Sequence, residues 1–343
     1  MASDKPLLYS ILDLSPILAG GTAGDSFRHS LDLAQHAERW GYTRYWLAEH
    51  HNIAGVASAA TSVVVGFIAG GTSHIRVGSG GIMLPNHAPL VIAEQFGTLE
   101  SLYPGRIDLG VGRAPGGDQR TARALRRNLG SDGDTFPRDL LELQSYFGAS
   151  QSGQAVRAIP GEGLHVPIYL LGSSDFSARL AAEQGLPFAF ASHFAPDYLH
   201  AAIGMYRAQF EPSATHATPH VMVGVNVFAA DTDEEARRLF TSLQQQFLGM
   251  VRGIRREVQP PVATMEGRWN PAEKAHVEHM TRYSVVGSRA TVREGLEKLI
   301  AATGADEIIA TGSIFDHAAR LHSFEIAAEV FKEINASAEL KVA

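Results

Sequence analysis

Short apolar runs alternate with longer segments of helical periodicity along most of the chain. Each apolar run is only a few residues long, which is typical of a strand that is buried on both faces. Strands that alternate with helical segments are the pattern of βαβ units and a parallel sheet. Eight strands are predicted, over residues 7–12, 44–48, 76–84, 106–112, 167–172, 188–192, 220–229 and 307–311.

Helices are predicted between these strands. They span residues 25–40, 58–71, 88–103, 133–149, 174–185, 196–210, 232–257 and 316–335, with further helices at 271–283 and 289–303. The clearest is 232–257, which Thr232 and Glu235 open as a capping box. Its apolar residues form one stripe: Ala236, Leu239, Phe240, Leu243, Phe247, Met250 and Val251. Eight strand–helix units with short apolar strands favour a closed (β/α)8 TIM barrel over an open sheet.

Three connections are longer than a barrel requires. Residues 112–133 follow the fourth strand, 150–166 precede the fifth, and 259–284 follow the seventh. Long connections in a compact domain are often functional. We find no interdomain linker, so we expect a single domain over residues 1–343 with insertions after strands 4 and 7 and before strand 5.

Composition and charge exclude several classes of function. The formal net charge is −7 with both signs mixed along the chain, so no basic face for nucleic acid is visible. The absence of cysteine excludes disulfides, thiolate metal sites and a cysteine nucleophile. The N-terminus lacks a signal-peptide run, and the apolar stretch 63–69 is too short to cross a bilayer. We expect a cytoplasmic protein without a membrane segment.

Three polar residues, Glu49, His50 and His51, follow the second predicted strand directly. The carboxyl ends of barrel strands face the active site, and histidine exchanges protons near neutral pH. A neighbouring carboxylate can fix the imidazole tautomer, which makes this group a candidate for acid–base catalysis. The alternative is a polar cap on the barrel mouth. A zinc site is less favoured, because no HExxH motif and no third ligand at metal spacing accompany it.

Glycines mark the next two strands. Gly80 and Gly81 lie inside the third strand, where they predict either a close approach of a flat ligand or a simple kink. The fourth strand ends at Gly112, and its glycine spacing resembles a dinucleotide fingerprint, but Pro115 prevents a helix from opening at once. Arg113 is the candidate for a phosphate contact.

The fifth strand ends in Gly172, Ser173 and Ser174, and Ser177 lies in the first turn of the helix that follows. Free N–H groups at a helix start, together with small hydroxyl residues, can bind a phosphate. Ordinary N-capping by Ser173 or Ser174 is the alternative.

Four long segments carry a resemblance to a known family: 46–52, 76–117, 166–194 and 306–331. With them the chain resembles the bacterial luciferase-like flavin monooxygenases over nearly its whole length. It is most similar to a subgroup that includes tailoring oxygenases of aromatic polyketide antibiotics. The resemblance implies that His50 is the catalytic histidine beside the flavin, accompanied by Glu49 and His51.

The same resemblance implies the cofactor contacts. Gly80–Gly81 would form a non-prolyl cis peptide under the isoalloxazine ring. Arg113, Ser174 and Ser177 would bind the FMN phosphate, with Ser173 nearby, and residues 259–284 would form a mobile loop. The reactive cysteine of light-emitting luciferase corresponds to Gly112 here, so light emission is not expected.

The function implied is a two-component monooxygenase. Reduced FMN (FMNH2), supplied by a separate flavin reductase, and O2 would oxygenate a small organic substrate, such as an aromatic polyketide or an aldehyde, through a C4a-peroxyflavin. The resemblance also implies a homodimer built through the second and third helices. Two alternatives remain. One is hydride transfer with coenzyme F420, whose acidic tail would suit Arg113, Arg120, Arg123, Arg126 and Arg127; the other is a non-catalytic flavin-binding protein.

Overall fold

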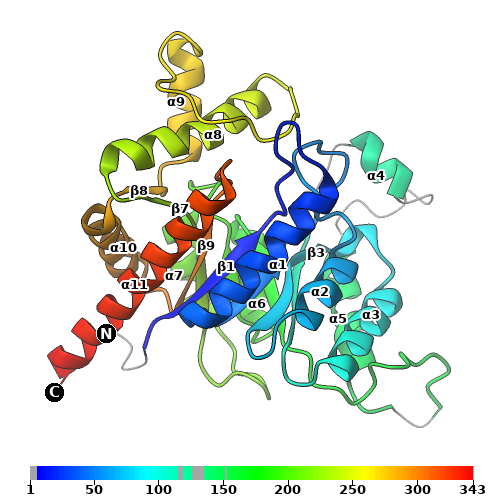
Figure 1. Ribbon diagram of the computed structural model, residues 1–343. Coiled ribbons are helices and arrows are strands. Elements are labelled where there is room, and N and C mark those ends of the chain that lie inside the picture. Colours follow the sequence, from blue (N-terminus) through cyan, green and yellow to red (C-terminus); the bar gives the residue numbers. More distant parts are fainter. Residues whose placement is uncertain (1–5, 115–118, 126–134, 151–152, 343) are drawn as a thin grey trace.

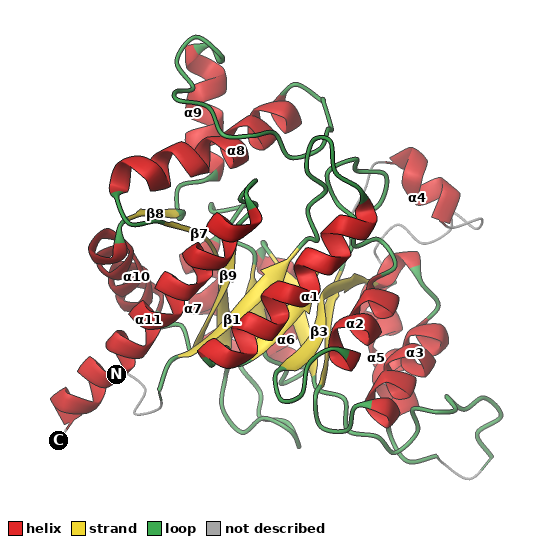
Figure 2. Ribbon diagram, in the orientation of Figure 1, coloured by secondary structure: helices red, strands yellow, loops and turns green. Residues whose placement is uncertain are grey.

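The computed structural model describes residues 6–114, 119–125, 135–150 and 153–342. Eight parallel strands close into a barrel: β1 to β6 follow one another, β6 pairs with β7, β7 with β9, and β9 with β1. Helices surround these strands on the outside (Figures 1 and 2). The predicted (β/α)8 barrel is confirmed.

All eight predicted strands are present. They are β1 (Leu8–Asp13), β2 (Arg44–Leu47), β3 (Arg76–Met83), β4 (Ile107–Gly112), β5 (Ile168–Gly172), β6 (Phe188–Phe190), β7 (Val221–Ala229) and β9 (Glu307–Thr311). The strand β8 (Val285–Gly287) was not predicted. It pairs with Val227 to Ala229, at the end of β7 that extends beyond the pairing with β9. Three residues are too few to show strand periodicity, so only the pairing defines this element.

The helices also follow the predicted order. They are α1 (Ala23–Trp40), α2 (Thr61–Gly70), α3 (Pro89–Leu102), α4 (Gln119–Leu125), α5 (Phe136–Phe147), α6 (Asp175–Glu183), α7 (Leu199–Gln209), α8 (Asp233–Val251), α9 (Pro271–Met280), α10 (Arg289–Thr303) and α11 (His317–Val342). The short helix α4 was not predicted as a separate element, α8 ends earlier than predicted, and α11 continues further. A 3-10 turn, Leu84–Asn86, follows β3.

The start of α8 differs in one detail from the predicted capping box. The hydroxyl of Thr232 accepts a hydrogen bond from the amide of Glu235, at 3.2 Å, as expected. The Glu235 carboxylate, however, pairs with Arg238 at 2.7 and 2.8 Å. At the far end of the predicted stripe, Met250 and Val251 are exposed, because the helix extends there beyond the core that it covers.

The alternation of side chains along the strands produces two cores. An inner cluster fills the middle of the barrel and comprises Leu12, Trp46, Ala48, Tyr169, Ala189, Met222 and Ile309. The neighbouring strand residues point outward into the larger core beneath the helices, as Tyr45 and Leu47 do. The interior of the barrel is therefore packed, and we call the rim formed by the carboxyl ends of the strands its mouth.

A buried charge network lies at the opposite end, where the strands begin. Arg44 pairs with Asp108 and with Glu307, each at 2.8 Å, and all three side chains are buried. Burial by itself would raise the pKa of Glu307, but the charge of Arg44 and the hydrogen bond from His220 lower that pKa to about 2. Because the network is at the amino ends of the strands, we assign it to stability rather than to catalysis.

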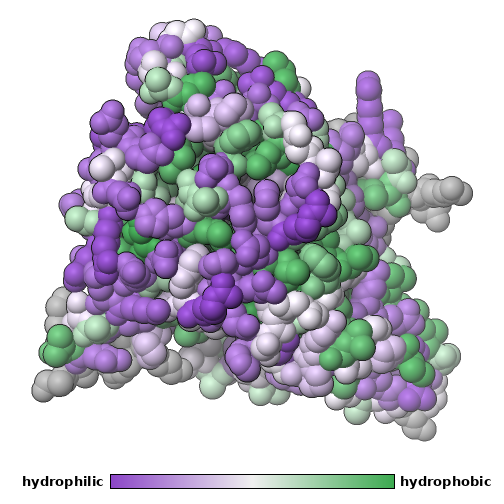
Figure 3. Space-filling model, viewed as in Figure 1, coloured by the Kyte–Doolittle hydropathy of each residue, from purple (hydrophilic) through white to green (hydrophobic). Residues whose placement is uncertain are grey.

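Most of the face in Figure 3 is polar, with apolar patches on the side where Figure 1 places α2 and α3. Exposed apolar side chains on these two helices are Val63, Phe67, Val91 and Leu102. None of the helices in the described ranges combines the length and the apolar character needed to cross a bilayer.

Candidate active site

The sequence-predicted site residues all lie at one end of the barrel. They follow or end β2, β4 and β5, or lie in the second half of β3, and these four strands are neighbours in the sheet. Parallel strands in a barrel end at the same rim, so these residues share the mouth. They form two groups there, one after β2 and β3 and the other after β4 and β5.

Glu49 is the centre of the first group. Its side chain is fully buried and accepts hydrogen bonds from Nε2 of His51 at 2.8 Å and Nε2 of His87 at 2.9 Å. The amide of Met83 donates a further bond at 3.0 Å, and Asn86 lies at 3.3 Å. The carboxylate therefore joins the loop after β2 to the loop after β3.

These contacts decide the charge state of Glu49. Burial would raise its pKa, but the hydrogen bond and charge of His87, the bond from His51 and the amide of Met83 outweigh burial and lower the pKa below its ordinary value. Glu49 is thus a carboxylate at neutral pH that orients two imidazole rings. His87 was not singled out from the sequence; the available signal was a histidine in the connection that follows the third strand.

The Gly80–Gly81 segment lies next to the inner core. The peptide bond between the two glycines is cis, as the resemblance implies. A Cβ atom on Gly80 would come within 2.7 Å of Leu12 and 3.1 Å of Trp46, and one on Gly81 within 2.7 Å of the Gly110 carbonyl oxygen. The inner wall is therefore bare backbone at this height, with no room for a side chain.

The second group surrounds the start of α6. The Arg113 guanidinium lies 4.1 Å from the ring centroid of Phe176, which brings the end of β4 to the first turn of α6. A Cβ on Gly172 would collide with the Ser177 hydroxyl, so β5 and α6 meet closely here. Ser174 occupies the N-cap position, but its side chain makes no capping hydrogen bond.

This arrangement argues against simple capping as the purpose of the serines. Ser173 and Ser174 are partly exposed, and Ser177 is buried against Gly172. The amide groups at the start of α6 are left without a side-chain acceptor from the N-cap residue, which is the geometry of an anion site at a helix N-terminus. Arg113 adds a positive charge beside it.

A second histidine that the sequence did not single out, His193, lies in the loop after β6. His50 is close enough to His193 to affect its ionisation: burial, and then the charge of His50, lower the pKa of His193 to about 4. The mouth thus carries histidines from the loops after β2, β3 and β6. Among the described residues there is no group of three or more potential ligands placed to hold a metal ion.

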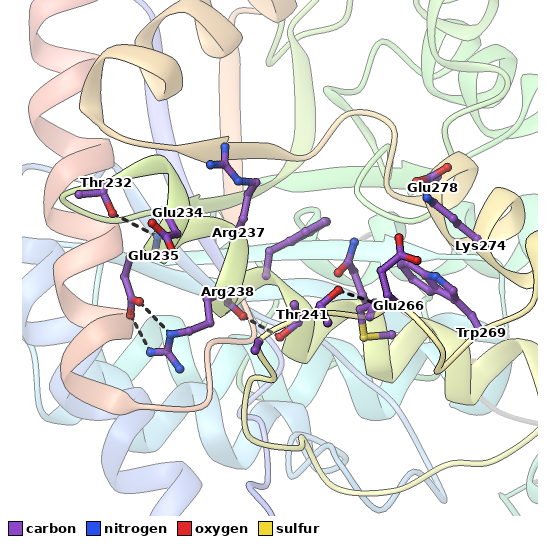
Figure 4. A pocket seen from close by; sticks show the side chains of 15 residues that line it. Thr232, Glu234, Glu235, Arg237, Arg238, Thr241, Glu266, Trp269, Lys274 and Glu278 are labelled. Carbon is purple, nitrogen blue, oxygen red and sulfur yellow. Dashed lines mark hydrogen bonds and ion pairs between the residues drawn. The ribbon is translucent and has the colours of Figure 1, made fainter.

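A groove of about 550 Å³ lies elsewhere, between α8, the segment 263–269 and α9 (Figure 4). Its rim carries both signs of charge, including Arg237, Lys274, Glu266 and Glu278. None of the predicted site residues lines it. We therefore place the candidate active site at the barrel mouth.

Comparisons with known proteins identify the family to which the chain belongs. The luciferase-like monooxygenase family matches residues 9–307. A luciferase-like monooxygenase of Escherichia coli (strain K12) is 55% identical over 332 residues, which is 97% of this chain and 99% of the relative. The uncharacterized protein YvbT of Bacillus subtilis (strain 168) is 59% identical over 329 residues, covering 96% and 98% of the two chains.

Among solved structures, apo-MsnO8 is similar with a TM-score of 0.88 and 36% identity, covering 95% of this chain and 98% of that one. The agreement extends over the barrel and its insertions rather than over one motif. This chain is a member of the luciferase-like monooxygenase family.

Proposed function

We propose that this protein is the oxygenating component of a two-component monooxygenase, which uses reduced FMN from a separate flavin reductase, together with O2, to oxygenate a small organic molecule. The observation that carries the proposal is the juxtaposition, on neighbouring strand ends, of a helix start without a side-chain cap beside Arg113, a stretch of backbone without side chains and a histidine-rich rim. Membership of the family supports the oxygenase class.

The phosphate would be held at α6. Hydroxyl groups of Ser173, Ser174 and Ser177 and the amides of the first turn supply neutral donors, and Arg113 supplies charge. Phe176 supports the guanidinium from one side, so that Arg113 is ordered before a ligand arrives.

The flat ring would lie against Gly80 and Gly81. A side chain at either position would collide with Leu12, Trp46 or the Gly110 carbonyl, so this stretch stays free of side chains and its backbone could approach a ring closely. Bound reduced FMN would supply the two electrons that reduce O2, so that one oxygen atom enters the substrate and the other leaves as water.

The protein's own task is positioning and proton management. His50 would hold or deliver a proton at an imidazole nitrogen. Glu49 fixes His51 and His87 and thereby the two loops beside it. The long connection 259–284, which contains α9, would help to exclude water from the barrel mouth.

The test uses photoreduced FMN mixed with aerated buffer in a stopped-flow instrument, with and without a panel of aldehydes, ketones and phenols. We expect flavin reoxidation at a rate different from that of free FMNH2, and an oxygenated product. His50→Ala should lower product yield by about 10²-fold or more, as expected for loss of a general acid–base group, with little change in FMN affinity. The control is His216→Ala, which alters a histidine before β7 at the other end of the barrel.

Two results would contradict the proposal. One is reoxidation at the rate of free flavin with no product from any compound. The other is tight binding of oxidised flavin without product formation and with no effect of His50→Ala on any rate, which would favour a non-catalytic flavin-binding protein.

Coenzyme F420 remains a second candidate cofactor because of the arginines that follow β4. Arg120 and Arg123 lie on α4, a short helix beyond Arg113, whereas Arg126 and Arg127 fall outside the described residues. A basic surface here would suit the acidic tail of that coenzyme. Dissociation constants for FMNH2 and reduced F420 decide between the two, and we expect tighter binding of FMNH2.

We further propose that the protein forms a homodimer through α2 and α3. Four large apolar side chains on these helices are exposed, with Val63 at 71% and Leu102 at 62% of their full accessibility. Exposed apolar groups that gather on adjoining helices are typical of an interface between subunits.

A further inference from the structure

Asn226 is a buried polar residue that lies between two apolar groups on the inner face of β7. The preceding residue, Val225, belongs to the large outer core, and side chains alternate along a strand, so Asn226 faces inward. On the same face, Met222 belongs to the inner cluster of the barrel, whereas Phe228 belongs to a separate core with α8 and α9. Asn226, which is 3% exposed, therefore lies where the barrel interior meets the core of the 259–284 connection.

The side-chain amide of Asn226 binds two segments that are far apart in the sequence. It donates to the carbonyl of His193, in the loop 191–198 after β6, at 2.6 Å. It also donates to the hydroxyl of Ser284, at the end of the 259–284 connection, at 3.1 Å. A carbonyl oxygen can only accept, so the NH2 group of Asn226 must face His193. This one group therefore ties both segments to β7.

The choice of a polar residue at this position has a physical consequence. Asn226 is the only polar side chain among the residues of β7, and burying an amide is unfavourable unless its hydrogen-bonding groups are paired. An apolar side chain would fill the position but would not select its neighbours, because apolar contact has no direction. The hydrogen bonds of Asn226 therefore specify which two segments meet at this point of the mouth.

The 259–284 connection has another attachment near its start. The amide of Val258, a buried residue, donates to the carbonyl of Ile17 at 2.9 Å, and the amide of Ala19 donates to the carbonyl of Val258 at 2.9 Å. Residues 17 and 19 belong to the loop after β1, so they lie on the side of the carboxyl ends of the strands. The connection is therefore attached to the mouth at both ends, beside β1 and beside β7.

The loop 191–198 is also part of the mouth. The hydroxyl of Ser192 donates to the carbonyl of Gly224 at 2.5 Å, and a Cβ atom on Gly224 would lie 2.6 Å from Nδ1 of His193. The imidazole thus packs directly on the backbone of β7. His193 is also close enough to His50 for the charge of His50 to affect its ionisation. A movement of this loop would therefore change the surroundings of His50.

Two exposed pairs extend the contact between the loop and the connection. Nε2 of His279, on α9, lies 2.6 Å from the carboxylate of Asp197, and the hydroxyl of Tyr283 lies 3.1 Å from Nε2 of His200 on α7. The side chains of His279 and Asp197 are 48% and 61% exposed, so this pair contributes little by itself. Asn226 supplies the buried part of the contact.

We propose that Asn226 is a positioning residue that holds the loop 191–198 and the end of the 259–284 connection together at the mouth, and thereby limits the access of water to the bound flavin. The inference rests on the proposed function, in which the flavin lies at the ends of β2 to β5 and the connection shields it. Asn226 acts through these two segments and not on the reacting atoms. Its loss would free both segments, whereas loss of the Ser284 hydroxyl would free only the connection.

The first experiment measures hydrogen–deuterium exchange on the flavin-free protein. Asn226→Leu keeps a side chain of similar size without polar atoms, Ser284→Ala removes the hydroxyl, and Ser284→Thr retains it. The matched control is Asn335→Leu. The amide of Asn335 also makes two hydrogen bonds to the backbone, with the N–H and the carbonyl of Leu7 at 2.9 and 3.0 Å, but at the amino end of β1.

We expect Asn226→Leu to raise the exchange rates of peptides from 191–198 and 281–287 by about tenfold, because two hydrogen bonds that oppose local opening are lost. Ser284→Ala should raise exchange in 281–287 by about threefold and leave 191–198 nearly unchanged. Ser284→Thr should resemble the wild type. Asn335→Leu should change neither segment, and peptides from α1 should stay at the wild-type rate in Asn226→Leu and in both Ser284 variants.

The second experiment measures iodide quenching of the fluorescence of bound oxidised FMN in the same proteins. The quenching constant should rise by about twofold or more in Asn226→Leu and in Ser284→Ala, because the mouth is then open for a larger fraction of the time. Ser284→Thr and Asn335→Leu should match the wild type. The dissociation constant of FMN should change by less than about threefold, since the phosphate contacts proposed at α6 are untouched.

Unchanged exchange of both segments in Asn226→Leu would overturn the inference, as would an equal rise over the whole protein, which is general destabilisation. Faster local exchange without a change in iodide quenching would overturn it as well. If Asn226→Leu does not fold, the contrast between Ser284→Ala and Ser284→Thr decides by the same criteria. Failure of the wild-type protein to bind FMN is a different result. It refutes the proposed function and the shielding role with it, while the exchange rates still decide whether Asn226 holds the two segments.

Discussion

Glu49 shows how much of the candidate site a local sequence pattern can predict. The residues 49–51 were predicted to form a polar group at a strand end, and the structure places Glu49 against His51 there. The partner that completes the group, His87, comes from the loop after the next strand. A short apolar run that is followed by polar residues locates a strand end, but it does not say which side chain of a neighbouring loop will reach that end. The roles proposed for these residues stay predictions.

Substitution of Arg113 is expected to lower the affinity for flavin. Arg113→Ala should weaken FMN binding by about 10- to 100-fold, because a charged hydrogen bond to the phosphate is lost. Phe176→Leu should cause a smaller loss, since only the support for the guanidinium is removed. Fluorescence titration with FMN and with riboflavin, which lacks the phosphate, provides the measurement.

Riboflavin is the internal control for this prediction. Its affinity should be nearly equal in the wild type and in Arg113→Ala, because neither complex contains a phosphate contact. Arg293→Ala, which breaks an exposed pair on α10, should change neither affinity. A parallel loss of FMN and riboflavin affinity would refute the phosphate assignment.

At the scale of elements, length decided what could be predicted. Long amphipathic helices such as α1 and the strands of the barrel have clear periodicity, and their existence was predicted correctly. The three-residue strand β8 and the short helix α4 have too little pattern of their own. The strand β8 is defined by tertiary context, because the end of β7 extends far enough to pair with it.

The proposed dimer interface is tested on α2. Phe67→Glu should shift the protein from dimer to monomer, because a charge placed in an apolar interface would be buried without a partner. Size-exclusion chromatography with light scattering measures the mass at several protein concentrations. Ile254→Glu is the control, since Ile254 is similarly exposed but follows α8, away from both helices. An unchanged mass for Phe67→Glu, or a wild-type monomer, would rule out this interface.

For the whole molecule, the charges at the amino ends of the strands govern stability against acid. The pKa of Glu307 is about 2 in the folded protein, below its ordinary value of 4.5, because Arg44 and His220 outweigh the effect of burial. A lowered folded-state pKa contributes stability that is complete above pH 4.5. That stability is lost as pH falls toward 2.

We therefore expect the free energy of unfolding to fall between pH 4.5 and 2, with Glu307 contributing about 3 kcal/mol of the loss. Glu307→Gln should lower stability at pH 7 by about 3–5 kcal/mol, because Arg44 loses a buried partner, and should flatten the acid dependence. Urea titrations at a series of pH values provide the test. The control is Glu297→Gln, which breaks the exposed pair of Glu297 with Arg293. This substitution should lower the free energy of unfolding by less than about 1 kcal/mol. A wild-type-like acid profile in Glu307→Gln would contradict this assignment.

By itself the sequence determined the eight barrel strands, the longer helices and their order, because apolar runs, helical periodicity and strand-end motifs are local properties of the chain. It also placed the candidate residues of β2 to β5 at one rim, since parallel strands in a barrel end together. Only the tertiary structure decided which distant side chains meet, such as Glu49 with His87, or His193 with Gly224 and His50. Those contacts depend on strand register and on closure of the barrel between β9 and β1, which no local pattern encodes.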